Sequence, residues 1–132
     1  MGKRTTSRRL AMQAIYQAEI SNNSIEEALK NLFESEKFID ETIGFSEKLA
    51  KQAWADREWS DQIIAKFSVD WPLDRIGKVD RSILRLSFSE LKAAETPPSV
   101  VVNEAVELAK KYSSEEAAKF INGILGAYLR LP

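Results

Sequence analysis

Apolar residues recur every three or four positions along most of the chain, which is the spacing of one face of an α-helix. The first run contains Leu10 and Ala14 and predicts a helix over about residues 6–20. Ser24 followed by Glu27 forms a capping box, so a second helix is expected to begin there. The predicted helices cover about residues 6–20, 24–36, 40–56, 60–67, 80–94, 99–112 and 113–130. This pattern predicts an all-α fold.

Polar residues and prolines mark the boundaries between these helices. Further serines are expected to cap later helices: Ser60, Ser99 and Ser113. A break is expected over residues 68–72, and the prolines of residues 96–98 end the helix before them. The β-branched residues 100–102 would suit a strand, but the pattern that follows them favours a helix. We therefore predict a compact bundle of about seven helices, forming a single domain over residues 1–132.

Composition narrows the class of function. The 132 residues are 44% hydrophobic and 30% charged, which is typical of one domain with a packed core. The chain has no cysteine and no histidine, so disulfides, thiolate nucleophiles, cysteine-ligated zinc and histidine-based catalysis are excluded. It also has no glycine-rich phosphate loop, and its paired carboxylates stand at helix starts, where they favour the helix dipole. We expect a protein that is not an enzyme and needs no cofactor or metal.

No apolar run reaches the length of about 18–20 residues that a membrane span needs. The basic N-terminus also lacks the apolar stretch of a signal peptide. We therefore expect a soluble, cytoplasmic protein that does not contact a membrane.

Positive charge is concentrated at the start of the chain, although the net charge is −1. Four basic residues precede the first acidic one, Glu19: Lys3, Arg4, Arg8 and Arg9. A basic arm within residues 1–20 on a near-neutral body predicts a local site for a polyanion. The alternative is an ordinary solvated terminus.

The first predicted helix has a polar face whose residue types suit binding to a nucleic acid or to a protein partner. Arg9, Gln13 and Tyr16 share one face, and Arg4 and Arg8 are expected on the adjoining stripe, opposite the core. Arginine suits phosphate, glutamine can read base edges, and an exposed tyrosine can stack on a base or anchor a partner. Tyr16 half-buried at the surface is the alternative.

Polar residues in two later helices can be explained by structural roles. Arg85 lies in an apolar helix and is expected to pair with a buried carboxylate, either Glu104 or Glu90. Asp80, near the start of that helix, is explained by dipole compensation or by capping. Asn122 is either a buried amide or a surface contact, and the sequence leaves both readings open.

Four stretches in this order resemble the NusB family of bacterial antitermination proteins. They are RRLAMQAIYQ (8–17), WPLDRIGKVDRSILRL (71–86), PPSVVVNEAVELAKK (97–111) and KFINGIL (119–125). The chain departs from the family where Gln52, Ala53 and Trp54 replace a common glycine–hydrophobic pair. Either the packing of the third helix differs there, or Trp54 fills the space that the usual residues leave.

The resemblance implies a non-enzymatic protein of two small helical subdomains. It implies binding to the boxA element of ribosomal RNA together with ribosomal protein NusE, in support of the elongating RNA polymerase. The RNA-binding residues it implies are Lys3, Arg4, Arg8, Arg9, Gln13, Phe67 and Lys119. The NusE-binding residues it implies are Tyr16, Asp80 and Glu116.

Two other functions are compatible with the same sequence. A helical adaptor or homodimer could bury the basic arm against a partner and bind no specific RNA. A targeting module related to ribosomal RNA methyltransferases is the other, although no catalytic domain is expected after this helical one.

Overall fold

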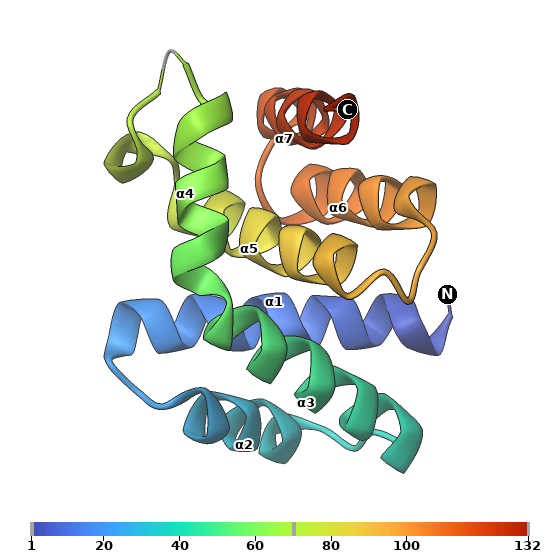
Figure 1. The fold of residues 1–132 in the computed structure, drawn as a ribbon. Coiled ribbons are helices and arrows are strands. Elements are labelled where there is room, and N and C mark those ends of the chain that lie inside the picture. Colours follow the sequence, from blue (N-terminus) through green and yellow to red (C-terminus); the bar gives the residue numbers. More distant parts are fainter. Residues whose placement is uncertain (1, 70, 132) are drawn as a thin grey trace.

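The computed structural model describes residues 2–69 and 71–131, and over these residues it is built from helices alone (Figure 1). The helices are α1 (Lys3–Ser21), α2 (Ile25–Ser35), α3 (Asp40–Ala55), α4 (Arg57–Phe67), the short 3₁₀ helix η1 (Leu73–Arg75), α5 (Lys78–Ala93), α6 (Pro98–Tyr112) and α7 (Glu115–Leu129). The prediction of an all-α fold is confirmed. Residues 1, 70 and 132, which the predicted domain includes, lie outside the described residues, and so does part of the predicted break at 68–72.

The second helix begins where its sequence predicts. The Ser24 hydroxyl accepts a hydrogen bond from the Glu27 backbone N–H at 3.1 Å, which satisfies one of the free donors of the first turn. Residues 100–102 lie within α6, so the helical prediction for this β-branched segment is also confirmed.

The three other serine caps were predicted wrongly. Ser60 lies inside α4 and is buried, because α4 starts directly after Asp56. Ser99 also lies inside its helix, since α6 begins at Pro98, whose missing N–H is not needed at the first helical position. The cap of α7 is Ser114, which accepts from the Ala117 N–H at 3.0 Å, one residue later than predicted.

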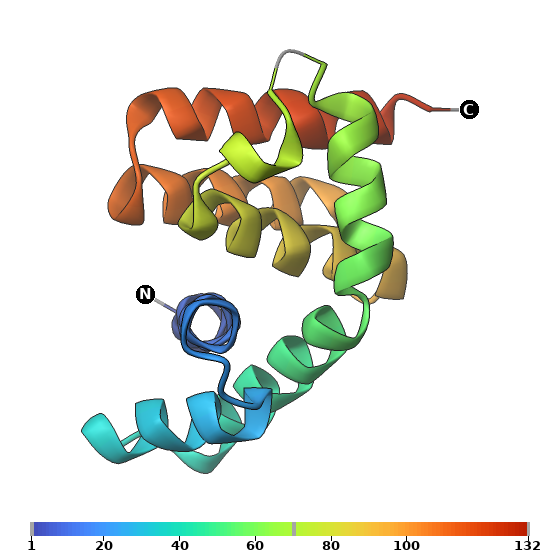
Figure 2. The same cartoon turned by 90° about the vertical axis from the view of Figure 1, so that its left-hand side faces the viewer.

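The helices form two groups that meet along α1 and α5. Helices α1, α2 and α3 pack together, and α5, α6 and α7 form the second group, with α4 leading from α3 and packing against α5 and α7 (Figures 1 and 2). Helix α1 contacts both α5 and α6, so its first turns face the second group. Its buried face includes Ala11, Ala14 and Ile15, each almost completely shielded from solvent.

Aromatic side chains fill the space between α4, α5 and α7. Phe88 is fully buried and meets the Tyr128 ring edge to face, with centroids 5.0 Å apart. Phe67 meets the other side of Tyr128 at 6.3 Å. Such edge-to-face pairs add about 0.5–1.5 kcal/mol each beyond the burial of apolar area. This cluster fixes the end of α4 against α7.

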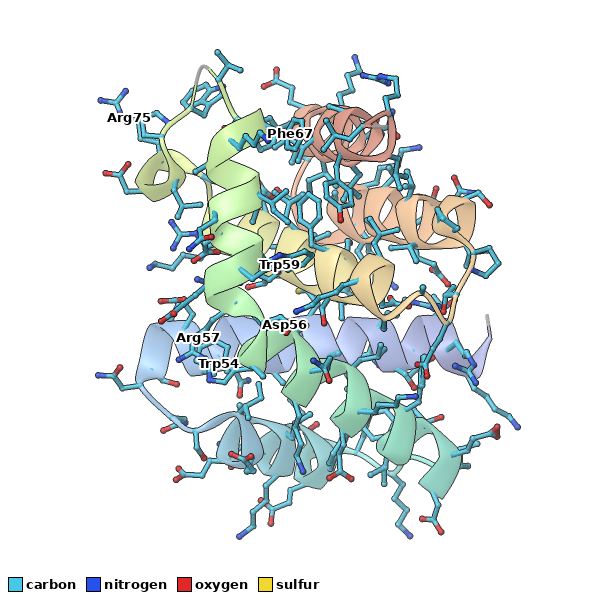
Figure 3. All side chains as sticks on the ribbon, in the orientation of Figure 1. Trp54, Asp56, Arg57, Trp59, Phe67 and Arg75 are labelled. Atoms are coloured by element: carbon cyan, nitrogen blue, oxygen red, sulfur yellow. The ribbon has the colours of Figure 1, made fainter. Side chains whose placement is uncertain are left out.

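The corner between α3 and α4 carries the aromatic residue that departs from the family pattern (Figure 3). Trp54 is half-buried, and the Arg57 guanidinium lies 4.2 Å from the centre of its ring. Nearby, Asp56 accepts hydrogen bonds from Ser89 at 3.0 Å and from Lys92 at 3.3 Å. Trp54 therefore fills this corner, and Asp56 ties it to α5.

Two buried arginines connect α1 with α5 in a reciprocal way. Arg8 of α1 donates two hydrogen bonds to Glu90 of α5, at 2.7 and 2.9 Å, and Arg85 of α5 donates one to Glu19 of α1 at 2.6 Å. Each arginine also meets a second carboxylate: Arg8 bonds Glu104 at 3.2 Å, and Arg85 bonds Asp61 at 2.7 and 2.9 Å.

The predicted partners of Arg85 are therefore wrong. Glu90 and Glu104 hold Arg8, whereas Arg85 is held by Glu19 and Asp61. The physical expectation was sound, because a buried arginine needs carboxylates. The helix packing decides which carboxylates they are.

Acid should weaken the Arg85–Glu19 pair. The hydrogen bond from Arg85 holds the pKa of Glu19 below its ordinary value of 4.5. A carboxyl whose pKa is lowered on folding stabilises the protein above the unfolded value, and this contribution is lost as the pH falls through the folded value. We expect Glu19→Gln to be less stable than the wild type near neutral pH, with a difference that shrinks as the pH falls below 4.5.

Urea unfolding of both proteins across this pH range measures the difference. Glu34→Gln, an exposed change on α2, is the control and should show no such trend. A Glu19→Gln deficit that stays constant down to about pH 3 would contradict the expectation, because the carboxyl would then not be titrating in this range.

Candidate nucleic-acid interface

The first turn of α1 presents two exposed basic side chains. Lys3 lies 3.0 Å from Glu41 of α3, and the Arg4 guanidinium stacks 4.0 Å from the centre of the Phe45 ring. The Lys3–Glu41 pair is open to solvent on both sides, so it contributes little stability and can exchange partners easily. Both side chains are therefore exposed to solvent, and their role in binding an anion stays a prediction.

Arg8 is buried in the structure, whereas the sequence predicts it on an exposed stripe. Its side chain is only 3% exposed, and Glu90 and Glu104 occupy its donors. Burial alone would lower the pKa of Arg8, but the hydrogen bonds and charges of these two carboxylates raise it, so the guanidinium stays charged. The prediction that Arg8 lies on an exposed stripe is wrong, because α5 and α6 cover α1 at this point. Arg8 is a structural residue beneath the surface.

A groove of about 450 Å³ separates α1 from α6, and we call it the α1–α6 groove. Its lining includes Arg9 of α1 and four residues of α6: Glu104, Glu107, Lys110 and Lys111. Arg9 is half-buried and donates to Gln13 at 3.3 Å, so these two predicted residues lie together. The groove brings three cations within one concave surface.

Lys110 and Lys111 were missed as candidate site residues. Their only signal in the sequence is two consecutive lysines in the last turn of a helix, where they also favour the helix dipole. Their place beside Arg9 depends on the packing of α6 against α1.

A second groove, the α6–α7 groove, continues from the first with a volume of about 430 Å³. Glu107 and Lys110 line both grooves, and Lys119 and the exposed Asn122 line the second. The predicted residue Lys119 therefore lies in the groove next to the α1–α6 groove, beside Glu107 and Glu115, and Asn122 is a surface residue.

Phe67 lies away from both grooves. It ends α4 and points toward α7, where it packs against Tyr128 (Figure 3). It lines neither the α1–α6 groove nor the α6–α7 groove. The structure does not bring Phe67 together with the other predicted RNA-binding residues, and it assigns this side chain to the aromatic cluster.

Two predicted partner-binding residues, Asp80 and Glu116, line one pocket of about 250 Å³, which we call the α5–α7 pocket. Phe120 and the exposed Trp71 line it too. One carboxylate oxygen of Asp80, Oδ1, is buried and accepts no hydrogen bond from any described residue. Tyr16 is half-buried and does not line this pocket. The pocket therefore combines the apolar surface of Trp71 and Phe120 with two carboxylates, and Arg75 lines it as well.

These features define a class: a small all-α protein with a groove of three cations and two carboxylates on one pair of helices, and a pocket of aromatic and charged residues on another. No helix in the described part of the chain has the length and apolar character to cross a bilayer. The NusB family model matches residues 5–130, and the chain belongs to this family.

Relatives and solved structures agree with this assignment. The chain is 43% identical over 132 residues to the transcription antitermination protein NusB of Acetivibrio thermocellus, covering 99% of this chain and 90% of the relative. It is 41% identical over 124 residues to the Bacillus subtilis protein of the same name, covering 93% and 92%. A crystal structure of antitermination factors NusB and NusE in complex with double-stranded RNA contains a chain with a TM-score of 0.88 and 32% identity, covering 96% of each chain.

Proposed function

We propose that this protein is a transcription antitermination factor that binds RNA together with a NusE partner. The observation that carries the proposal is the α1–α6 groove, where Arg9, Lys110 and Lys111 line one concave surface. The names of its relatives and the NusB–NusE–RNA complex support the same role. In this role the whole chain acts as one RNA-binding unit, it works in the bacterial cytoplasm, and it needs no catalytic residues.

The groove suits the backbone of a single RNA strand. Cations that neutralise phosphates release bound counterions, which gives affinity for any sequence and a strong dependence on salt. Lys3 and Arg4 add exposed positive charge at the start of α1, and Lys119 adds one in the neighbouring α6–α7 groove. Arg8 contributes indirectly, because it holds α1 against α6 through Glu104.

The α5–α7 pocket is the surface that we assign to the NusE partner. It is lined by Asp80, Glu116 and Phe120 and is distinct from the α1–α6 groove. A partner bound there would leave the groove open to RNA, so both can be bound at once. Such a complex can join the elongating polymerase through surfaces of either protein.

Binding of a short boxA-like RNA and of a scrambled control, with and without NusE, tests the proposal. We expect NusE to strengthen binding to boxA and not to the scrambled RNA, and we expect both affinities to fall with salt. Equal binding of the two RNAs in the presence of NusE, or no binding, would contradict it. The protein would then be a helical adaptor or homodimer.

Substitution of Asp80 should separate partner binding from RNA binding. We expect Asp80→Ala to weaken NusE binding about tenfold, which corresponds to about 1.4 kcal/mol, because a charged residue lining the proposed partner pocket is lost. Direct binding of RNA by the isolated protein should not change. Calorimetry with NusE and RNA titrations measure the two effects, with the exposed change Glu58→Ala as a control. Unchanged NusE affinity would remove Asp80 from the partner surface.

A further inference from the structure

Glu104 places a fixed carboxylate at the edge of the α1–α6 groove. Its side chain is 19% exposed, and one oxygen, Oε1, accepts two hydrogen bonds, from Thr5 at 2.8 Å and from Arg8 at 3.2 Å. The other oxygen, Oε2, accepts none from any described residue. One oxygen is therefore held in place while the other keeps its capacity to accept a hydrogen bond.

The support beneath Glu104 is rigid. Arg8 is itself held by two hydrogen bonds to Glu90, and both residues are buried. The Glu104 carboxylate therefore rests on a fixed guanidinium, and little rotamer entropy remains to be lost when a ligand binds. This is the preorganisation expected of a recognition group.

The charge around Glu104 indicates what it can recognise. Arg9, Lys110 and Lys111 line the same groove and attract phosphates, whereas a carboxylate repels them. A carboxylate can instead accept a hydrogen bond from a base, for example from the N4 amino group of cytosine. Uracil presents an oxygen at the corresponding position, and two acceptors repel each other.

Building on the proposed RNA-binding role, we infer that Glu104 is a specificity-determining residue that reads one unpaired base in the α1–α6 groove. Its Oε2 accepts a hydrogen bond from the exocyclic amino group of that base, while the neighbouring cations bind the adjoining phosphates. At this one position the protein prefers cytidine to uridine.

Glu107 provides a matched control in the same groove. It is also an α6 carboxylate, but its side chain is 67% exposed, and Lys110 is 3.9 Å away. No hydrogen bond within the described residues fixes its orientation. Removing its charge should raise the affinity for all RNAs alike, through electrostatics alone.

Glu104→Gln is the decisive variant. A glutamine can keep its carbonyl oxygen toward Thr5 and Arg8, which places its NH₂ group where Oε2 was. The groove would then present a donor instead of an acceptor. Binding is measured with NusE present, at one salt concentration, for a boxA-like RNA and for versions with single exchanges between cytidine and uridine.

We expect the wild type to show one position where uridine weakens binding about tenfold relative to cytidine. Glu104→Gln should abolish or invert this preference, and Glu107→Gln should retain it. Thr5→Val removes one of the two bonds that fix Oε1 and should reduce the preference without inverting it. Circular dichroism establishes that each variant is folded.

The outcomes separate this inference from the proposed function. If the wild type binds none of the RNAs, both are wrong. If it binds them and Glu104→Gln keeps the same preference at every position, Glu104 has only a structural role. If Glu104→Gln fails to fold, Thr5→Val decides, and an unchanged preference in that variant overturns the inference.

Discussion

Arg8→Ala is expected to destabilise the protein by about 3–5 kcal/mol, which is the usual cost of removing one partner from a buried ion pair. Glu90 is only 6% exposed and would lose both of its hydrogen bonds from Arg8. Glu104 would keep only its bond from Thr5. The buried charge left on Glu90 dominates the loss, because water cannot reach it freely.

Urea unfolding near neutral pH measures this effect, and Arg4→Ala is the matched control. Arg4 lies one helical turn earlier, is exposed, and interacts with the Phe45 ring, so its removal should cost at most about 1 kcal/mol. Equal stabilities of the two variants would contradict the structural role of Arg8. Any loss of RNA binding in Arg8→Ala should follow the loss of folded protein and of groove geometry.

Removing the three cations of the α1–α6 groove should have the largest effect on RNA binding. Each phosphate contact to single-stranded nucleic acid contributes about 0.7 to the slope of log affinity against log salt. Combining Arg9→Gln, Lys110→Gln and Lys111→Gln should therefore lower the slope by about 2, equivalent to a loss of about 100-fold at about 0.1 M salt. The folded structure should be retained, because these residues lie at the surface.

Fluorescence titrations of RNA at several salt concentrations give the slope directly. A second triple variant removes equal charge from the region of α2 and α3, through Lys30→Gln, Lys37→Gln and Lys51→Gln. If both triple variants lost the same affinity, binding would depend on overall charge, and the groove would have no special part in it.

Much of the fold could be predicted from the sequence, because helical periodicity is a local property. The spacing of apolar residues located every α-helix, and the Ser24 cap was correct. The predictions of the other caps were wrong for a local reason too, because serine also occurs within helices, as Ser60 and Ser99 do. A serine alone does not mark a helix start.

The site was less predictable, because it depends on contacts between distant helices. The sequence indicates that a basic stripe and a buried arginine exist, but not that Arg8 is covered and Arg9 is not. The carboxylates of Arg8 come from positions 82 and 96 residues further along the chain. Lys110 and Lys111 join Arg9 for the same reason, through the packing of α6 against α1.

The reciprocal arginine pairs also constrain the order in which the chain can fold during its synthesis. Helices α1 to α3 leave the ribosome first, but Arg8 and Glu19 find their partners only when α5 has emerged, and Glu104 follows with α6. Until then nothing covers Arg8, because α5 and α6 are the helices that bury it, so its guanidinium stays in contact with water. The ion pairs that join the two groups of helices therefore form only after the second half of the chain has been made.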